Sequence, residues 1–220
     1  MSSDAGYHHN GDSDEMRLLT LLTFTTLAFA MGAFGQDSNV ISLRPDEFQV
    51  RYASNLNHGD SVINITNTGS TLTDRGSNLC ANVYAFDPSE EIVSCCACLV
   101  TPNALVSLSV QGDLISNTLS PSTPTAVVIK LVASLPDSGQ CNPGVGLNTA
   151  FGMRAWGTTL HVLPGTPTTY GLTESGFLPG GLSRAELDHL TSFCGFIEAN
   201  GSGFGICKSC RSGGLGGAKQ

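Results

Sequence analysis

The chain has 220 residues and a formal net charge of −8 at pH 7. Only 13% of its residues are charged, well below the roughly 25% of an ordinary soluble domain. Because the few basic residues form no cluster, we expect neither a nucleic-acid partner nor binding to an anionic membrane.

The N-terminal part predicts export. Residues 16–35 have the order of a secretory signal peptide: Arg17 supplies a positive charge, residues 18–30 are largely apolar, and small residues precede Gln36. The apolar stretch is shorter than the roughly 20 residues that a membrane-spanning helix needs. We therefore expect no membrane span in the mature chain, and residues 1–15 are interpreted as a non-native or mis-annotated lead.

Short alternating runs between Gly, Pro and Asn turns predict a mainly β fold. The runs cover residues 48–52, 62–66, 80–86, 92–100, 105–110 and 126–133. A late hairpin is predicted from residues 158–163 and 168–173. Because no helix separates these strands, residues 51–180 are expected to form an antiparallel β-sandwich of the Ig-like or pilin-like kind.

One helix is predicted in the C-terminal region, residues 181–220. Ser183 and Glu186 have the spacing of a capping box, and Asn200-Gly201 is a typical stop signal. Between them, apolar side chains recur at helical spacing at Leu187, Leu190, Cys194 and Ile197. The helix is expected to pack on the sandwich, and the glycine-rich loop after it is expected to need positive φ angles.

The mature part holds all eight cysteines, an even number that indicates disulfide bonds in an exported protein. They are Cys80, Cys95, Cys96, Cys98, Cys141, Cys194, Cys207 and Cys210. Side chains alternate between the faces of a strand, so Cys95, Cys96 and Cys98 are expected to reach different partners. Cys80, on a neighbouring strand, is a natural partner for one of them. Cys194 is close enough in sequence to pair with Cys207 or Cys210.

Two other interpretations of the cysteines compete with disulfides. Cys207-Lys208-Ser209-Cys210 has the spacing of a thiol redox motif, although it does not follow a strand as in a thioredoxin-like unit. Together with Cys95, Cys96 and Cys98 it offers the thiolates of a zinc site. The oxidising compartment favours disulfides, so we expect no metal and no cofactor.

The common catalytic templates are missing, and we expect no enzymatic activity. The chain has no Gly-x-Ser-x-Gly, Ser-x-x-Lys or His-Glu-x-x-His motif and no phosphate-binding loop. Lys130, inside the most apolar run, is interpreted as an outward-facing or edge lysine rather than an amine of depressed pKa. The single tryptophan, Trp156, is expected in the core rather than on a sugar-binding surface.

Four stretches of the sequence form a familiar combination. They are LCANVYAFDPSEE at 79–91, CCAC at 95–98, TSFCGFI at 191–197 and CKSC at 207–210. With these motifs the chain resembles a group of uncharacterised, secreted, cysteine-rich acidobacterial proteins. The resemblance implies export and disulfide bonds, and it implies no activity and no site.

The expected function is a secreted structural subunit of the cell surface that polymerises with itself. In strand donation, an extended terminal segment of one subunit completes the sheet of the next. Residues 36–50 suit this role because apolar side chains alternate along them, at Ile41, Leu43, Phe48 and Val50. The same segment is equally suited to be the first strand of its own sandwich. The alternatives are a monomeric module that adheres to matrix or carbohydrate, and a cysteine-ligated metal or redox protein.

Overall fold

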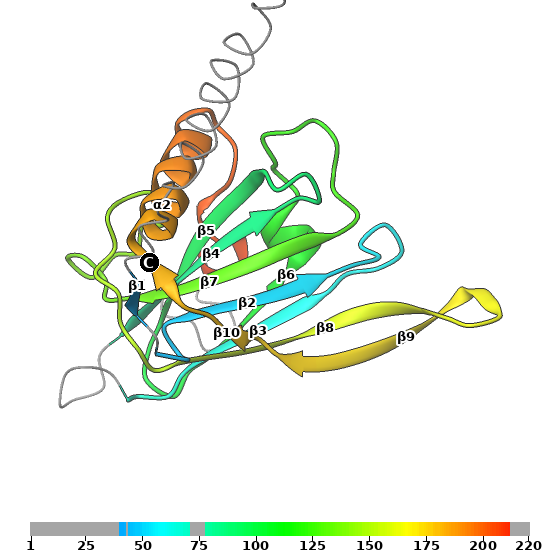
Figure 1. Cartoon of the computed structure of the whole chain (residues 1–220), viewed down its shortest axis with the longest axis horizontal. Helices are drawn as coiled ribbons and strands as arrows, with labels where there is room; N and C mark the ends of the chain where they lie inside the picture. The colour runs from blue at the N-terminus through cyan, green and yellow to red at the C-terminus, as the bar shows by residue number, and fades with distance from the viewer. Residues whose placement is uncertain (1–39, 43, 71–77, 212–220) are drawn as a thin grey trace, which may run out of the picture. The chain divides into compact units, whose positions relative to one another are not determined.

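The computed structural model describes residues 40–42, 44–70 and 78–211. The expected lead, the signal peptide, Leu43 and the last residues of the tail lie outside the described residues. The described part contains two antiparallel-rich β-sheets, a small two-stranded pair and one long helix (Figure 1). This confirms the prediction of a mainly β, sandwich-like fold with a C-terminal helix.

The larger sheet has six strands in the order β10-β2-β7-β4-β5-β12. Their bounds are Leu178–Pro179 (β10), Phe48–Ala53 (β2), Val127–Ser134 (β7), Leu79–Phe86 (β4), Ile92–Val100 (β5) and Gly205–Ile206 (β12). Every pair is antiparallel except β12, which lies parallel to β5. Strands β4 and β5 are buried along their whole length, so both faces of the sheet are covered there.

The smaller sheet has four antiparallel strands in the order β6-β3-β8-β9. Their bounds are Leu105–Ser109 (β6), Val62–Asn67 (β3), Met153–Leu163 (β8) and Thr166–Gly176 (β9). The predicted late hairpin is confirmed as β8–β9, and both strands are longer than the sequence pattern indicated. The two-stranded pair joins Val40–Ser42 (β1) to Leu182–Ser183 (β11).

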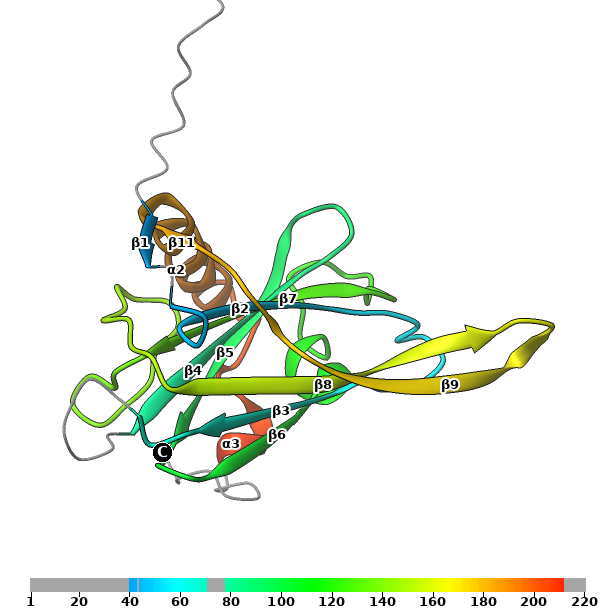
Figure 2. The same ribbon diagram turned by 60° about the horizontal axis from the view of Figure 1, so that its bottom comes forward.

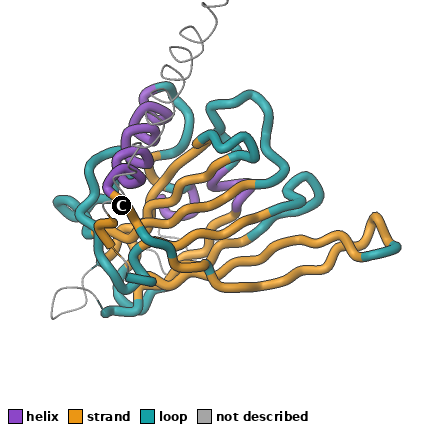
Figure 3. Tube along the Cα trace, in the orientation of Figure 1, coloured by secondary structure: helices purple, strands orange, loops and turns teal. Residues whose placement is uncertain are grey.

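The elements form three layers, with the larger sheet in the middle. One core, which includes Ile65, Leu108 and Leu131, lies between the two sheets. A second core lies between the larger sheet and helix α2 (Arg184–Ala199), where Tyr84 and Leu190 meet. Figure 3 shows this helix beside the sheets. Alternate residues of β4 and β5 belong to the two different cores, so the opposite faces of these central strands serve different layers.

Helix α2 begins and ends where the capping signals predict. The Ser183 side chain accepts a hydrogen bond from the Glu186 N–H at 3.1 Å, and Asn200 is the C-cap. The following turns need glycine because φ is +79° at Gly201 and +68° at Gly203, a region that disfavours a β-carbon. The chain then returns to the larger sheet as β12.

All eight cysteines are paired, which confirms the disulfide interpretation. The bonds are Cys80–Cys141, Cys95–Cys194, Cys96–Cys207 and Cys98–Cys210. The expectation that the three cysteines of β5 reach different partners is confirmed. Two suggested pairings are wrong, because Cys80 bonds to Cys141 and Cys194 bonds to Cys95.

The alternation of side chains along β5 explains these pairings. Cys95 belongs to the core beneath α2, so the helical Cys194 is its partner. Cys96 and Cys98 belong to the core between the sheets, where the tail enters with Cys207 and Cys210. Cys80 lies opposite Leu99 in the antiparallel register, several residues from Cys95, so it bonds to the loop that contains Cys141 instead.

One single-residue prediction holds in one of its two alternatives, and another needs correction. Lys130 faces outward, but it is not at a sheet edge, because β7 lies between β2 and β4. Its ammonium group lies 2.6 Å from Glu186 of the helix and 4.3 Å from the centre of the Phe86 ring. Trp156 is only half-buried and belongs to neither core, because its neighbours in β8, Ala155 and Gly157, occupy the inner face.

Removing one of the two tail disulfides is expected to cost much less than removing both. Cys96–Cys207 and Cys98–Cys210 close nearly the same stretch of chain, with separations of 111 and 112 residues. With one bond replaced by two alanines, the other still holds the tail, and the free energy of unfolding should fall by about 2 kcal/mol. With both replaced, no bond closes the loop of roughly 15 residues between Cys194 and the tail cysteines. The total loss in the free energy of unfolding should then reach about 5 kcal/mol.

Urea denaturation of the two single-bond variants and of the double-bond variant measures these losses. Removal of Cys80–Cys141 is a suitable control, because that bond does not hold the tail and its loss leaves both tail bonds in place. Equal losses for single and double removal of the tail bonds would contradict the redundancy.

Candidate functional site

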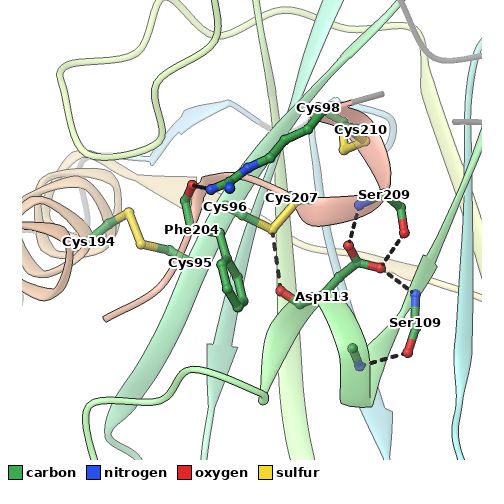
Figure 4. The surroundings of a disulfide bond; sticks show 12 residues. Cys95, Cys96, Cys98, Ser109, Asp113, Cys194, Phe204, Cys207, Ser209 and Cys210 are labelled. Atoms are coloured by element: carbon green, nitrogen blue, oxygen red, sulfur yellow. Dashed lines mark hydrogen bonds between the residues drawn. A yellow bond between two sulfur atoms is a disulfide. The ribbon is translucent and has the colours of Figure 1, made fainter. Parts of the chain in front are cut away.

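The C-terminal tail is fastened to β5 by covalent and polar contacts (Figure 4). Its short helix α3 (Lys208–Arg211) carries Cys210, and Cys207 directly precedes it. Asp113, in the π-helical turn η1 (Val110–Leu114), is 1% exposed and accepts hydrogen bonds from the N–H and hydroxyl of Ser209 at 2.7 and 2.8 Å. Cys207 and Cys210 bond to β5 and not to each other, unlike the cysteines of an oxidised redox motif.

The carboxylate of Glu198 lies beside the Cys95–Cys194 disulfide. Glu198 and the sulfurs of Cys95 and Cys194 have ligand atoms within 4.8 Å of one another, a spacing that would suit a metal. The two sulfurs are joined in a disulfide, so neither is the thiolate that metal binding requires. Burial raises the pKa of the Glu198 carboxyl, because the partly desolvated charge has lost water.

The predicted donor residues lie in two different places. Phe48 and Val50 belong to β2, which pairs along its whole length with β7 of the same chain. Phe48 is 6% exposed and packs in the core beneath α2. Ile41 lies in β1, which is held only by the two-residue strand β11. Contact of these residues with another copy stays a prediction, and within the described residues β2 already completes its own sheet.

The β8–β9 hairpin extends beyond the other strands of both sheets (Figure 2). Strand β3 pairs with β8 only from Met153 to Gly157, so residues 158–174 form a two-stranded ribbon, which we call the arm. The loop before β3 braces one side of it, where the Asn55 amide donates to the Leu160 carbonyl at 2.7 Å and His58 stacks on Tyr170. Three apolar side chains of the arm remain exposed: Leu172 by 62%, Val162 by 48% and Leu163 by 40%.

Strand β9 pairs with β8 on one side only. At 11 residues it is the longest strand among the described residues with an unpaired edge. Strand β9 has one proline near its start, Pro167, and one charged residue, Glu174, but from Thr168 to Ser175 it has no lysine and no further proline. Lysine and proline are the residues with which proteins commonly block an edge against pairing. The arm can therefore accept a further strand.

Besides a cavity of about 310 Å³ in which Lys130 is already paired with Glu186, two cavities have polar residues in their linings. One of about 480 Å³ lies under the loop of residues 134–148 beside Cys80–Cys141, and its charged residue, Asp137, is exposed. The other, of about 360 Å³, opens between β2 and the base of the arm, and Arg51 lines it together with His161. The second cavity is the better candidate for a binding site, because its charged residue, Arg51, is only 8% exposed.

The sequence did not reveal either the arm or this cavity. The alternation along residues 48–53 places Gln49 and Arg51 on one face of the strand, and this was the available signal. This alternation indicates that Arg51 shares a face of the strand with buried residues. The sequence alone does not tell which face lies inside, because that depends on the neighbouring layers.

The chain was compared with protein-family models, with curated proteins and with solved structures, and none of the three comparisons finds a match. The resemblance to secreted acidobacterial proteins therefore stays a prediction. Within the described residues, none of the helices reaches the length and apolarity that crossing a bilayer would require.

Replacing Glu198 by glutamine is expected to raise the melting temperature at neutral pH. Since burial raises the folded-state pKa of this carboxyl, the folded protein favours its neutral form. That contribution is fully present below the unfolded-state pKa of roughly 4.3 and is lost as the pH rises through the folded-state pKa. Glutamine is neutral throughout, so its advantage should vanish under acid conditions.

Thermal denaturation of wild type and Glu198→Gln at neutral and acid pH tests this directly. The exposed Glu91 provides the control substitution, Glu91→Gln. A melting-temperature difference for Glu198→Gln that is the same at both pH values would show that charge desolvation is not its cause.

Proposed function

We propose that this protein is an extracellular structural subunit that assembles with copies of itself, with the arm as the acceptor. The observation that carries the proposal is the unpaired edge of β9 on a ribbon that extends from the sandwich. A free two-stranded ribbon is marginally stable in water. Addition of a third strand would supply the missing main-chain hydrogen bonds.

The occupant that we propose is the N-terminal segment of a second copy, residues 36–43. Phe48 and Val50 belong to β2, which is paired along its whole length, so a donated strand must end before that point, and Pro45 separates the two parts. Ile41 lies in β1, and donation would replace the short pairing of β1 with β11. The segment alternates Ile41 and Leu43 with polar residues, as a strand with one apolar face does. Tyr170 and Leu172 alternate in the same way along β9.

Composition and covalent structure support an extracellular setting. Four disulfides are compatible with an oxidising compartment, and the sequence of residues 16–35 predicts export. A durable surface assembly would use each of these properties.

The test is assembly of the chain from residue 36 onward, purified without reductant and followed by light scattering and negative-stain electron microscopy. Leu172→Lys places a charge on the arm and is expected to leave monomers. Deletion of residues 36–43 removes the donor and should do the same. Circular dichroism establishes that each variant is folded.

Leu105→Lys is the matched control, because Leu105 is a 39% exposed leucine on the other edge of the smaller sheet. It is expected to assemble like wild type. Discrete monomers of the wild-type chain under every condition would overturn the proposal and favour the adhesion alternative. Assembly that survives deletion of residues 36–43 would rule out that segment as the donor.

A further inference from the structure

The cavity at the base of the arm lies where the two sheets separate. Strand β2 of the larger sheet forms one wall, and β8 and β9 of the smaller sheet form the other. Its volume is about 360 Å³, within the range of sites for small molecules. The lining residues all come from one chain, so binding within the cavity does not require the proposed assembly.

Arg51 reaches across this gap and is buried. Its guanidinium donates to the Ser175 carbonyl at 2.7 Å, to the Ser175 hydroxyl at 3.2 Å and to the Thr159 hydroxyl at 2.7 Å. All three acceptors are neutral. They position the guanidinium, but they do not neutralise its charge.

A buried charge usually has an ionic partner, and Arg51 has none in the part of the chain that the structure describes. Lys130 and Glu186 do form an ion pair, but on the other face of the larger sheet. Burial lowers the pKa of Arg51, and the negative charge of Glu174 partly offsets that effect. An arginine keeps its proton even when buried, so the cavity has a positive wall.

The other polar groups of the lining suit an anion. The hydroxyls of Thr159, Thr173 and Ser175 line the cavity, and so does His161, whose Nε2 lies 2.7 Å from the Thr173 hydroxyl. Hydroxyl and imidazole groups can each donate a hydrogen bond to a carboxylate. Asp and Glu are absent from the residues that line the cavity, so no lining carboxylate competes for Arg51.

We propose that this cavity binds the carboxylate of a small organic acid, with Arg51 as the ionic partner and the hydroxyls and His161 as further donors. The planar guanidinium matches a carboxylate better than it matches a round ion. The volume exceeds what a bare carboxylate fills, so the ligand carries an organic group, which can contact Val50, Tyr52 and Leu178 as well as the hydroxyls of the lining. A sugar acid such as a uronate has both parts.

The test uses the chain from residue 36 onward with galacturonate as the probe, and with galactose as its neutral counterpart. Acetate separates recognition of the carboxylate alone from recognition of the sugar acid. Titration is followed by the rise in melting temperature, since a ligand that binds only the folded state stabilises it, and by amide chemical shifts. Saturable binding of galacturonate is expected, with galactose inert and acetate weaker.

Arg51→Met should weaken galacturonate binding at least tenfold, because it removes the charge and keeps much of the length of the side chain. Arg154→Met is the matched control, since Arg154 lies exposed on β8 outside this cavity, and it should bind like wild type. Equal binding by Arg51→Met and wild type would overturn the proposal.

Arg51→Met also removes a contact between the sheets and can fail to fold, so a second measurement stands on the wild-type chain alone. Galacturonate should shift the amides of the lining residues in β2, β8 and β9 and leave those around Cys80–Cys141 unchanged. Shifts confined to the Cys80–Cys141 loop, or no saturable shift with any of the three probes, would overturn the proposal.

Discussion

Strand β5 and its three cysteines hold the layers of this protein together. Because side chains alternate along a strand, Cys95 faces the helix while Cys96 and Cys98 face the core between the sheets. The three bonds attach α2 to one face of the larger sheet and the C-terminal tail to the other. A single nine-residue strand thereby holds the helix on one face of the larger sheet and the tail on the other.

This covalent arrangement is compatible with the low charge of the chain. Charged residues make up 13% of the sequence, and the described residues include the part-exposed ion pair Lys130–Glu186. Exposed ion pairs contribute about 0–1 kcal/mol each, whereas a disulfide contributes about 2–4 kcal/mol by restricting the unfolded chain. A stable fold is thus reached with few charges. Of the charged groups near a core, Arg51 and Asp113 form hydrogen bonds, and Glu198 lies beside a disulfide.

The two proposals use different parts of the same hairpin. Its outer edge is an unpaired main chain, which recognises another strand through backbone groups and tolerates many sequences. Its base forms one wall of a cavity in which a single cation and several hydroxyls face inward, which recognises a charge. Assembly and ligand binding are therefore separable by substitution, since Leu172 and Arg51 lie in different settings.

The sequence by itself determined most of the longer strands, the helix caps and the presence of disulfides, because these follow from local periodicity, from short-range hydrogen bonds such as Ser183 to Glu186, and from the number of cysteines. Only the tertiary structure decided the disulfide partners, which depend on the face of β5 that each cysteine occupies and on the layer that covers that face. The outward position of Trp156, the central position of Lys130 and the burial of Arg51 were decided in the same way. A period of two tells which residues share a face, but which face lies inside is set by the packing of elements that are distant in sequence.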